Sequence, residues 1–317
     1  MSDGARLCPY GLRNVPSSWL RNLRDAGDIL RRARNPAELA KGLMPKQWLS
    51  RRVLNAAQAP DAKVGASEVA EALQALRNEL KAEAIDDAGK VDYPKLKESG
   101  AFARMQETSL LLRAIDFGEL RDDDARTAFW INIYNVLAIH GVLALEIRES
   151  VMEVPSFFGT VAYDIGGFVL TLDEIENGLL RRNAPHPATG ARPFPAEDPR
   201  LSLCPSEVDP RIHAALVCAS TSCPPVAFYD AAKLHRQLDL AASGYVAADV
   251  EVDDRKRVVR LPITFRYYQS DFGGPVGIQA FLLSHATPGQ RDTLRAAFDA
   301  DFRFDYHRYD WSLNSIV

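Results

Sequence analysis

The chain has 317 residues, of which 47% are hydrophobic and 25% are charged, and its net charge is −4. These values are typical of a soluble globular protein with a sizeable core. No apolar run reaches membrane-spanning length, and the N-terminus lacks the apolar core of a secretory signal. The four cysteines are too few and too irregularly spaced for a disulfide framework, which favours a reducing compartment. We therefore expect a cytoplasmic protein without a transmembrane segment.

Positive charge is concentrated at the N-terminus. Residues 1–60 contain eleven Lys or Arg and four Asp or Glu, a net charge of +7, which leaves −11 for the remainder. We expect a basic helical extension over 1–60 and one α+β domain over 61–317. A basic amphipathic segment can bind lipid, nucleic acid or an acidic protein surface. Because the rest of the chain is acidic, we favour docking onto it or onto another subunit, and we expect no nucleic-acid partner.

The first half of the chain has mainly helical patterns. Apolar spacing and capping residues predict helices over 17–34, 37–57, 67–84, 101–115 and 124–148. The last of these is apolar nearly all round, as is typical of a helix buried in the middle of a domain.

Beyond residue 160 strand patterns alternate with helical ones. A hairpin turns at Gly166-Gly167, and a Thr171–Glu174 capping box opens a helix that reaches about Arg182. Residues 183–209 are rich in proline and predict a long loop, which is often a lid or a binding element. The remaining predictions are a buried strand over 211–218, a helix over 230–247, a hairpin of 249–252 with 257–261, helices over 275–285 and 289–299, and a strand over 302–309. Together these patterns predict an α+β fold in which the buried central helix packs on a small, mainly antiparallel sheet.

The segment 211–225 is the strongest candidate for chemistry. An apolar run carrying His213 ends in a turn of small residues that contains Cys218 and Cys223. Such turns leave backbone N–H groups free and often hold catalytic side chains. Five residues separate His213 from Cys218, so on a regular strand their side chains face opposite sides of the sheet. Cys223 lies beyond the turn and is free of this constraint.

Polar residues on the central helix and at the C-terminus are further candidates. Asn132, Asn135 and His140 lie on an apolar helix, where each needs a hydrogen-bond partner or a site. Glu174 and Glu176 lie in the first turn of the next helix. The helix dipole stabilises a negative charge there, so these carboxylates also have a structural explanation. The closing Asp-Trp-Ser-Leu-Asn run predicts a tail that is tied into the fold. The remaining histidines are expected to be solvated: His186, His235, His285 and His307.

Several blocks resemble, in the same order, the motifs of domain-of-unknown-function family 547. The blocks span about 100–317 and comprise Ala128–Asn135 with His140, Leu172–Glu176, Asp209–His213, Cys218–Ser220, Ser222–Pro225 and Tyr309–Asn314. The resemblance implies a reusable domain that occurs alone or beside other modules in bacteria and plants. The order of Asn, Glu, His and Cys blocks is also similar in kind to papain- and transglutaminase-type cysteine hydrolases. Here, however, the central helix carries Asn where those enzymes have their nucleophilic Cys.

The leading hypothesis is a cysteine-dependent hydrolase or acyltransferase. Its nucleophile is Cys218 or Cys223, its base His213 or His140, its orienting group Asn135 or Glu174, and its substrate contacts Asn132, Ser220, Ser222 and Asp310. The first alternative is a non-catalytic protein-binding module in which the same residues are structural. The second is a metal site formed by His140, His213 and a thiol, although no ligand pair has the usual zinc spacing. No Gly-rich phosphate loop is present, and we expect no cofactor.

Overall fold

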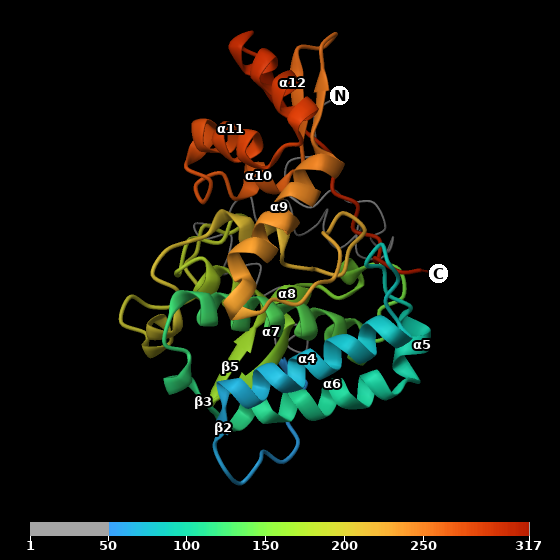
Figure 1. Ribbon diagram of the computed structural model, residues 1–317. Helices are drawn as coiled ribbons and strands as arrows, with labels where there is room; N and C mark the ends of the chain where they lie inside the picture. Colours follow the sequence, from blue (N-terminus) through green and yellow to red (C-terminus); the bar gives the residue numbers. More distant parts are fainter. Residues whose placement is uncertain (1–50, 317) are drawn as a thin grey trace, which may run out of the picture.

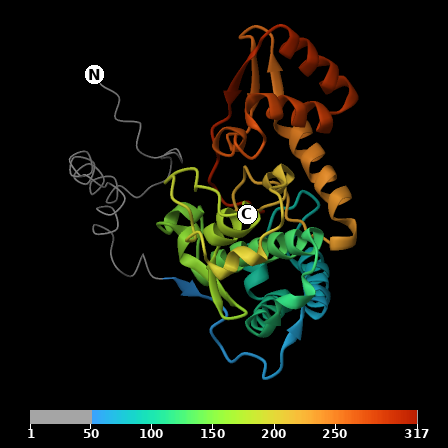
Figure 2. The same cartoon turned by 90° about the vertical axis from the view of Figure 1, so that its left-hand side faces the viewer.

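The computed structural model describes residues 51–316, which form two lobes with separate hydrophobic cores (Figures 1 and 2). The large lobe comprises residues 51–233, and the small lobe comprises residues 234–306. The helix that begins at Leu234 joins them, because its first turns belong to the large core and its later turns to the small one.

Three helices follow the first short strands. They are α4 (Ala66–Glu83), α5 (Tyr93–Lys97) and α6 (Gly100–Leu111). In α4 the buried residues Val69, Leu73, Leu76 and Leu80 recur every three or four positions, so one face packs into the core. In Figure 1, α4 and α6 lie side by side along the large lobe. The helices predicted over 67–84 and 101–115 are therefore confirmed.

Helix α7 (Asp123–Ala144) runs through the middle of the large lobe. Asp122 caps it by accepting a hydrogen bond from the Ala125 amide at 2.8 Å, and every residue from 127 to 143 is buried. The predicted central helix is confirmed. By length and composition α7 could cross a membrane, but 94% of its most apolar window is buried inside the lobe, as in a core helix.

The large lobe contains two small sheets. The strands are β1 (Arg52–Val53), β4 (Val161–Ile165) and β5 (Phe168–Thr171) in one sheet, and β2 (Val64–Gly65) with β3 (Ile115–Asp116) in the other. Strands β4 and β5 form the expected hairpin, and both turn glycines have positive φ, 58° at Gly166 and 87° at Gly167. Because β1 runs parallel to β4, the three-stranded sheet is mixed, and β2 and β3 form a parallel pair, so these sheets are not mainly antiparallel.

Of the two predicted helices nearest the N-terminus, only the last residues of the second, 51–57, can be compared with the structure. Most of the predicted 37–57 helix, and all of the 17–34 helix, lie outside the described residues. Within 51–57 the helix prediction is wrong, because Arg52–Val53 pairs as a strand with β4. The α+β class itself is confirmed.

After β5 the chain enters a helical segment, Glu174–Leu180, wound as a π-helix and called here the 174–180 helix. Its predicted capping box is present. The Thr171 hydroxyl accepts a hydrogen bond from the Glu174 amide at 3.2 Å, and the Glu174 carboxylate accepts one from the Thr171 amide at 3.0 Å. The long loop follows as predicted, interrupted only by the 3₁₀ turn Pro199–Leu203.

The prediction of a strand over 211–218 is wrong. Pro210–Ala214 forms a 3₁₀ helix, which Asp209 caps by accepting a hydrogen bond from the Arg211 amide at 2.9 Å. The Asp-Pro pair is a helix-start signal that outweighs the apolar run. The residues that follow do not extend a sheet, because Asn135 takes the backbone groups of Ala215 and Val217.

The small lobe places helices around a three-stranded sheet. Its elements are α9 (Leu234–Asp249), β6 (Glu251–Asp253), β7 (Val258–Leu261), α10 (Thr264–Tyr267), α11 (Gly274–His285), α12 (Pro288–Asp299) and β8 (Arg303–Tyr306). Each predicted helix and strand of this part is confirmed within a few residues. Strand β8 runs parallel to β7, although β6 and β7 form an antiparallel hairpin.

The C-terminal tail, residues 307–316, returns to the large lobe. The Leu313 amide donates to the Glu149 carbonyl at 2.8 Å, and the Asn314 amide donates to the Ala219 carbonyl at 3.1 Å. The Tyr93 hydroxyl donates to the Asn314 side chain at 2.7 Å. The tail is thus tied into the fold, as its aromatic and amide residues predict.

Candidate functional site

A pocket of about 90 Å³ lies where the two lobes meet, and we call it the crevice pocket. Its walls come from α7, the 174–180 helix, the long loop, the cysteine turn, α10 and the tail. It therefore joins side chains that are far apart in the sequence, namely Glu176, His186, His213, Cys218, Cys223 and Tyr309.

The two cysteines of the turn are joined by a disulfide bond. The turn closes through a hydrogen bond from the Cys223 amide to the Ser220 carbonyl at 3.0 Å and through Ala219, whose φ is +63°. Two free thiols were expected from the sequence. That expectation is wrong for this state of the protein, because the turn folds back and brings residues five positions apart into contact.

The sulfur atoms are surrounded by hydroxyl and amide groups. The Tyr309 hydroxyl lies 3.0 Å from the Cys218 sulfur and 3.1 Å from the Cys223 sulfur, and the Ser220 hydroxyl lies 3.2 and 3.4 Å away. The Cys218 amide donates to the Cys223 sulfur at 3.0 Å. Burial raises the pKa of Tyr309, although the Ser220 hydrogen bond acts to lower it, so Tyr309 is a neutral donor at physiological pH. Within residues 51–316, neither sulfur is hydrogen-bonded to an imidazole.

His213 reaches the crevice pocket but is part of a buried clamp between the lobes. Its Nε2 lies 2.9 Å from a carboxylate oxygen of Asp271, and Arg181 donates to both oxygens of the same carboxylate. The imidazole is also stacked on Tyr268, with ring centroids 4.1 Å apart. Burial acts to raise the pKa of Asp271, but hydrogen bonds from His213 and Arg181 hold it well below its usual range. The expected pairing of His213 with a cysteine is not formed.

His186, which was expected to be solvated, is the more accessible imidazole in the crevice pocket. Its Nε2 lies 3.5 Å from the Asp173 carboxylate, and in the neutral ring its Nδ1 accepts hydrogen bonds from the Ala188 and Thr189 amides at 3.1 and 3.3 Å, which are lost when Nδ1 takes a proton. Burial acts to lower its pKa, but the hydrogen bond and charge of Asp173 raise it overall. The imidazole is therefore oriented by its loop and is protonated more readily than a free histidine.

Of the two predicted glutamates, Glu176 lines the pocket beside Asp173, and Glu174 does not. The Tyr134 hydroxyl donates to Glu176 at 3.2 Å, and burial together with the Glu176 charge raises the pKa of Tyr134. Glu174 instead accepts from Arg51 at 2.8 Å and from Arg200 at 3.3 Å. Side chains two residues apart on a helix point in nearly opposite directions, so only one of the two can face the pocket. Glu174 is thus a capping and ion-pairing residue.

Asn135 is a structural residue that holds the cysteine turn to α7. Its side chain donates to the Ala215 and Ala227 carbonyls at 3.0 and 3.2 Å and accepts from the Val217 amide at 2.8 Å. The side chain is fully buried. It therefore orients the backbone that leads to Cys218. It makes no hydrogen bond to an imidazole of the described residues, which the predicted orienting role would require.

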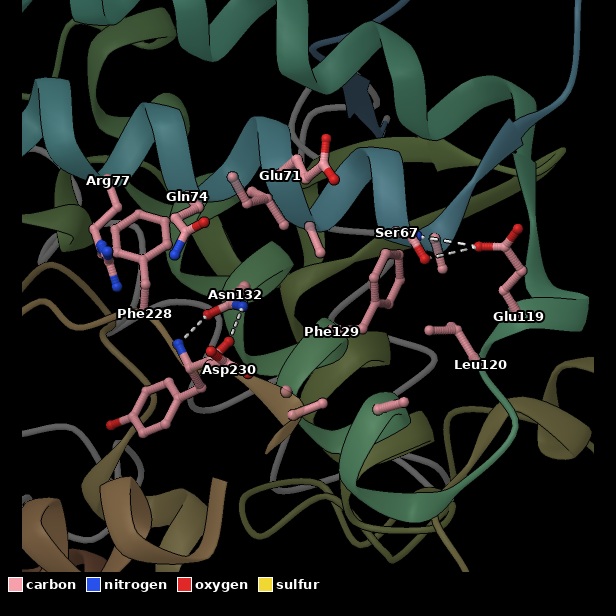
Figure 3. Close-up of a pocket in the computed structure, with 17 residues that line it drawn as sticks. Ser67, Glu71, Gln74, Arg77, Glu119, Leu120, Phe129, Asn132, Phe228 and Asp230 are labelled. Carbon is pink, nitrogen blue, oxygen red and sulfur yellow. Dashed lines mark hydrogen bonds between the residues drawn. The ribbon is translucent and has the colours of Figure 1, made fainter. Parts of the chain in front are cut away.

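Asn132 lines a different cavity, of about 310 Å³, between α4 and α7 (Figure 3). Its amide donates to the Tyr229 carbonyl at 2.7 Å, and its oxygen accepts from the Tyr229 amide at 2.8 Å. Figure 3 also shows Ser67 hydrogen-bonded to Glu119 on the opposite rim. The cavity does not include either cysteine, so Asn132 is separate from the crevice pocket.

His140 is also separate from the cysteines. Its Nδ1 is hydrogen-bonded to the Tyr163 hydroxyl at 2.7 Å, and its ring makes an edge contact with Phe102. Burial lowers its pKa to about 4, so it is neutral at physiological pH. The structure therefore contradicts its predicted role as a base and its predicted grouping with His213 around a metal.

The remaining predicted contacts belong to the turn and the tail. Ser220 is fully buried beside the sulfurs. The Ser222 hydroxyl accepts from the Asp310 amide at 2.9 Å, and the Asp310 carboxylate accepts from the Ser312 amide at 3.0 Å. These groups join the cysteine turn to the tail. Over the described part of the chain, no three His, Cys, Asp or Glu side chains converge in a way that could hold a metal ion.

Residues 118–246 match the family model described as "Protein of unknown function, DUF547". The chain contains a DUF547 domain. This confirms the family expected from the sequence motifs. The DUF547 match includes α7, the 174–180 helix and both cysteines, whereas Asp271 and Tyr309 lie beyond its end. No curated protein and no solved structure matches the chain.

Proposed function

We propose that this DUF547 protein is a cysteine-dependent hydrolase or acyltransferase that is active in its dithiol form. The main support is the crevice pocket, which joins Cys223 with His186, an imidazole that has its own carboxylate partner in Asp173. A nucleophile and an oriented acid or base in one cleft between two lobes are typical of acyl-transfer sites.

Cys223 is the better nucleophile of the pair. Both sulfurs lie near the Ser220 and Tyr309 hydroxyls, but among residues 51–316 only the Cys223 sulfur receives a backbone N–H, from Cys218. Hydrogen bonds to an ionised sulfur stabilise the thiolate, which is the reactive form. The backbone donor is held by the turn, so this stabilisation does not depend on a side-chain rotamer.

The reaction begins when an external dithiol transfers two electrons and two protons to the disulfide and is itself oxidised to a disulfide. A reducing cytoplasm, our expected location, would supply such a dithiol. The Cys223 thiolate then attacks an acyl carbonyl, and the leaving group departs with a proton from the His186 imidazolium. Neutral His186 next takes a proton from water, or from an alcohol or amine acceptor, which attacks the thioester and releases the thiolate.

Two single substitutions test this mechanism, because each removes the disulfide but leaves a different sulfur. We expect Cys218→Ser to hydrolyse an activated thioester without reductant, since Cys223 is then permanently free. Cys223→Ser should be inactive with or without dithiothreitol. Wild-type protein should become active only after reduction. The rates are measured together with iodoacetamide labelling, and the modified cysteine is located by mass spectrometry.

We expect Cys223 in Cys218→Ser to be alkylated at least tenfold faster at pH 7 than Cys218 in Cys223→Ser. The two variants share the loss of the disulfide, so each controls for its effect on stability. Equal labelling rates, or activity that persists in Cys223→Ser, would exclude Cys223 as the nucleophile.

A non-catalytic protein-binding module is the second candidate. It is favoured by Asn132, Asn135 and His140, which make structural contacts as that reading predicts. Under this reading both cysteines stay inert until the protein is unfolded. The docking of the basic N-terminal segment onto the acidic lobes belongs to this proposal. It would be supported if a synthetic 1–50 peptide bound the acidic remainder of the chain more weakly as the salt concentration rises.

A further inference from the structure

We infer that the crevice pocket binds a compact alkylammonium group of the substrate against Glu176, an inference that builds on the proposed function. It identifies the chemical class of substrate, an acyl compound that carries a primary amine close to its reacting carbonyl.

Glu176 is a buried carboxylate whose charge is not neutralised by an ion pair within residues 51–316. It is 9% exposed, lines the crevice pocket and accepts one hydrogen bond, from Tyr134. The nearby cations are engaged elsewhere, since Arg181 binds Asp271 and Asn177. A buried ionised carboxylate is unfavourable without a partner, so a cation supplied by the substrate would stabilise it.

His186 does not neutralise Glu176 either, because its Nε2 faces Asp173 at 3.5 Å. The two pairs His186–Asp173 and Arg181–Asp271 each balance one positive charge with one negative charge when His186 is protonated. His213 also bonds to Asp271 and lines the pocket, and while it is neutral Glu176 contributes the uncompensated negative charge of the pocket wall. This charge favours a cationic ligand over a neutral or anionic one.

Much of the remaining wall is aromatic. The rings that line the pocket are those of Tyr134, Phe158, Tyr267, Tyr268, Tyr309 and Trp311. Aromatic rings attract cations through their quadrupole, most strongly where water is excluded. The volume of about 90 Å³ is far below the 300 Å³ or more of typical small-molecule sites, so it admits a single head group. An ammonium group is compact and carries three donors, which suits this space better than a planar guanidinium.

Both cysteines line the same pocket. A substrate held by its ammonium group at Glu176 would therefore present its acyl group to Cys223 across only a few bonds. Neutral acyl compounds of the same size would lack this anchor.

Isothermal titration calorimetry with two isosteric probes tests the inference. The probes are Nα-acetyl-lysine amide and Nα-acetyl-2-aminoheptanoic acid amide, whose side chain ends in a methyl group where lysine has its ammonium group. We expect wild-type protein to bind the lysine probe at least tenfold more tightly, equivalent to about 1.4 kcal/mol. Glu176→Gln keeps the side-chain volume and should remove this preference. Glu207→Gln, an exposed control outside the pocket, should retain it.

Equal binding of the two probes to wild-type protein overturns the inference, and so does an unchanged preference in Glu176→Gln. If that variant does not fold, a lysine-probe affinity that does not fall between 50 and 500 mM salt overturns it instead. Binding does not use the nucleophile, so Cys223→Ser should keep the preference. If the wild-type protein binds the lysine probe preferentially but shows no acyl transfer, that result contradicts the proposed function and leaves the ammonium site in place.

Discussion

At the scale of single residues, neighbours decide what each ionisable group does. Glu174 and Glu176 have the same chemistry, but one is paired with arginines and the other faces the crevice pocket. The histidines divide in the same way. Asp173 keeps His186 easily protonated, whereas burial keeps His140 neutral.

The buried His140 predicts a specific loss of stability in acid. Its pKa is about 4 in the folded protein and 6.5 ordinarily, so the unfolded state binds more protons between these values. Stability should fall by about 3 kcal/mol as pH drops from 6.5 to 4, because each tenfold change in proton affinity equals about 1.36 kcal/mol. Urea unfolding across this range should show a shallower loss for His140→Gln than for wild type.

The exposed His235, with a side chain 67% accessible, offers a matched control. His235→Gln should leave the pH dependence of unfolding nearly unchanged. If the unfolding free energy of the wild type changes with pH as steeply as that of His140→Gln, the pKa of His140 is not lowered in the folded state.

At the scale of elements, α7 acts as the backbone support of the site. Its asparagines bond to the chain segments that carry Tyr229 and Val217, so the cysteine turn is held without belonging to a sheet. The 174–180 helix supplies the pocket carboxylate from its first turn, and its capping box fixes where that turn begins. One helix therefore positions the cysteine turn and another positions the acidic wall.

Asn135→Leu should be strongly destabilising. Leucine fills a similar volume but strands the Ala215 and Ala227 carbonyls and the Val217 amide, which Asn135 pairs in the wild type. Each unsatisfied buried group costs about 1–3 kcal/mol, so a total loss of at least about 3 kcal/mol is expected in urea unfolding. Leu137→Met, a volume-conserving change on the same helix, should cost under about 1.5 kcal/mol. A similar cost for both variants would show that the Asn135 hydrogen bonds contribute little.

At the scale of the whole molecule, the site exists because two lobes meet. The large lobe supplies the carboxylate, the His186 loop and the cysteines, and the small lobe supplies the opposite wall from α10. Arg181 and His213 of the large lobe both bind Asp271 of the small lobe and so fix their relative position. The tail then returns across the junction and places Tyr309 beside both sulfurs.

Asp271→Asn should loosen this junction. It removes the negative charge that compensates the buried Arg181, and breaking such a pair costs about 3–5 kcal/mol. Hydrogen exchange should increase in α10 and α11 more than in α4 and α6. The pKa of Asp271 is depressed, so its stabilisation is present above pH 3.8 and is lost only as pH falls further toward the folded-state pKa. Asp305→Asn, which changes an exposed pair with Arg260, should alter stability by less than about 0.5 kcal/mol.

The amino-acid sequence by itself predicts most elements of the described chain. Helices α4, α7, α9, α11 and α12, the Gly166-Gly167 hairpin and the Thr171–Glu174 capping box depend on residues within a few positions of each other. Local periodicity and capping chemistry are sufficient for such features. The family motifs likewise indicate the DUF547 domain directly.

The site itself depends on contacts that no local pattern contains. The Cys218–Cys223 disulfide requires the turn to fold back where an apolar run predicts a strand. Asp271 binds His213 across 58 residues and Arg181 across 90, and nothing near Asp271 in the sequence marks it as a partner. Only tertiary packing decides which carboxylate faces the pocket and which histidine is buried, because these choices depend on the elements that lie opposite each side chain.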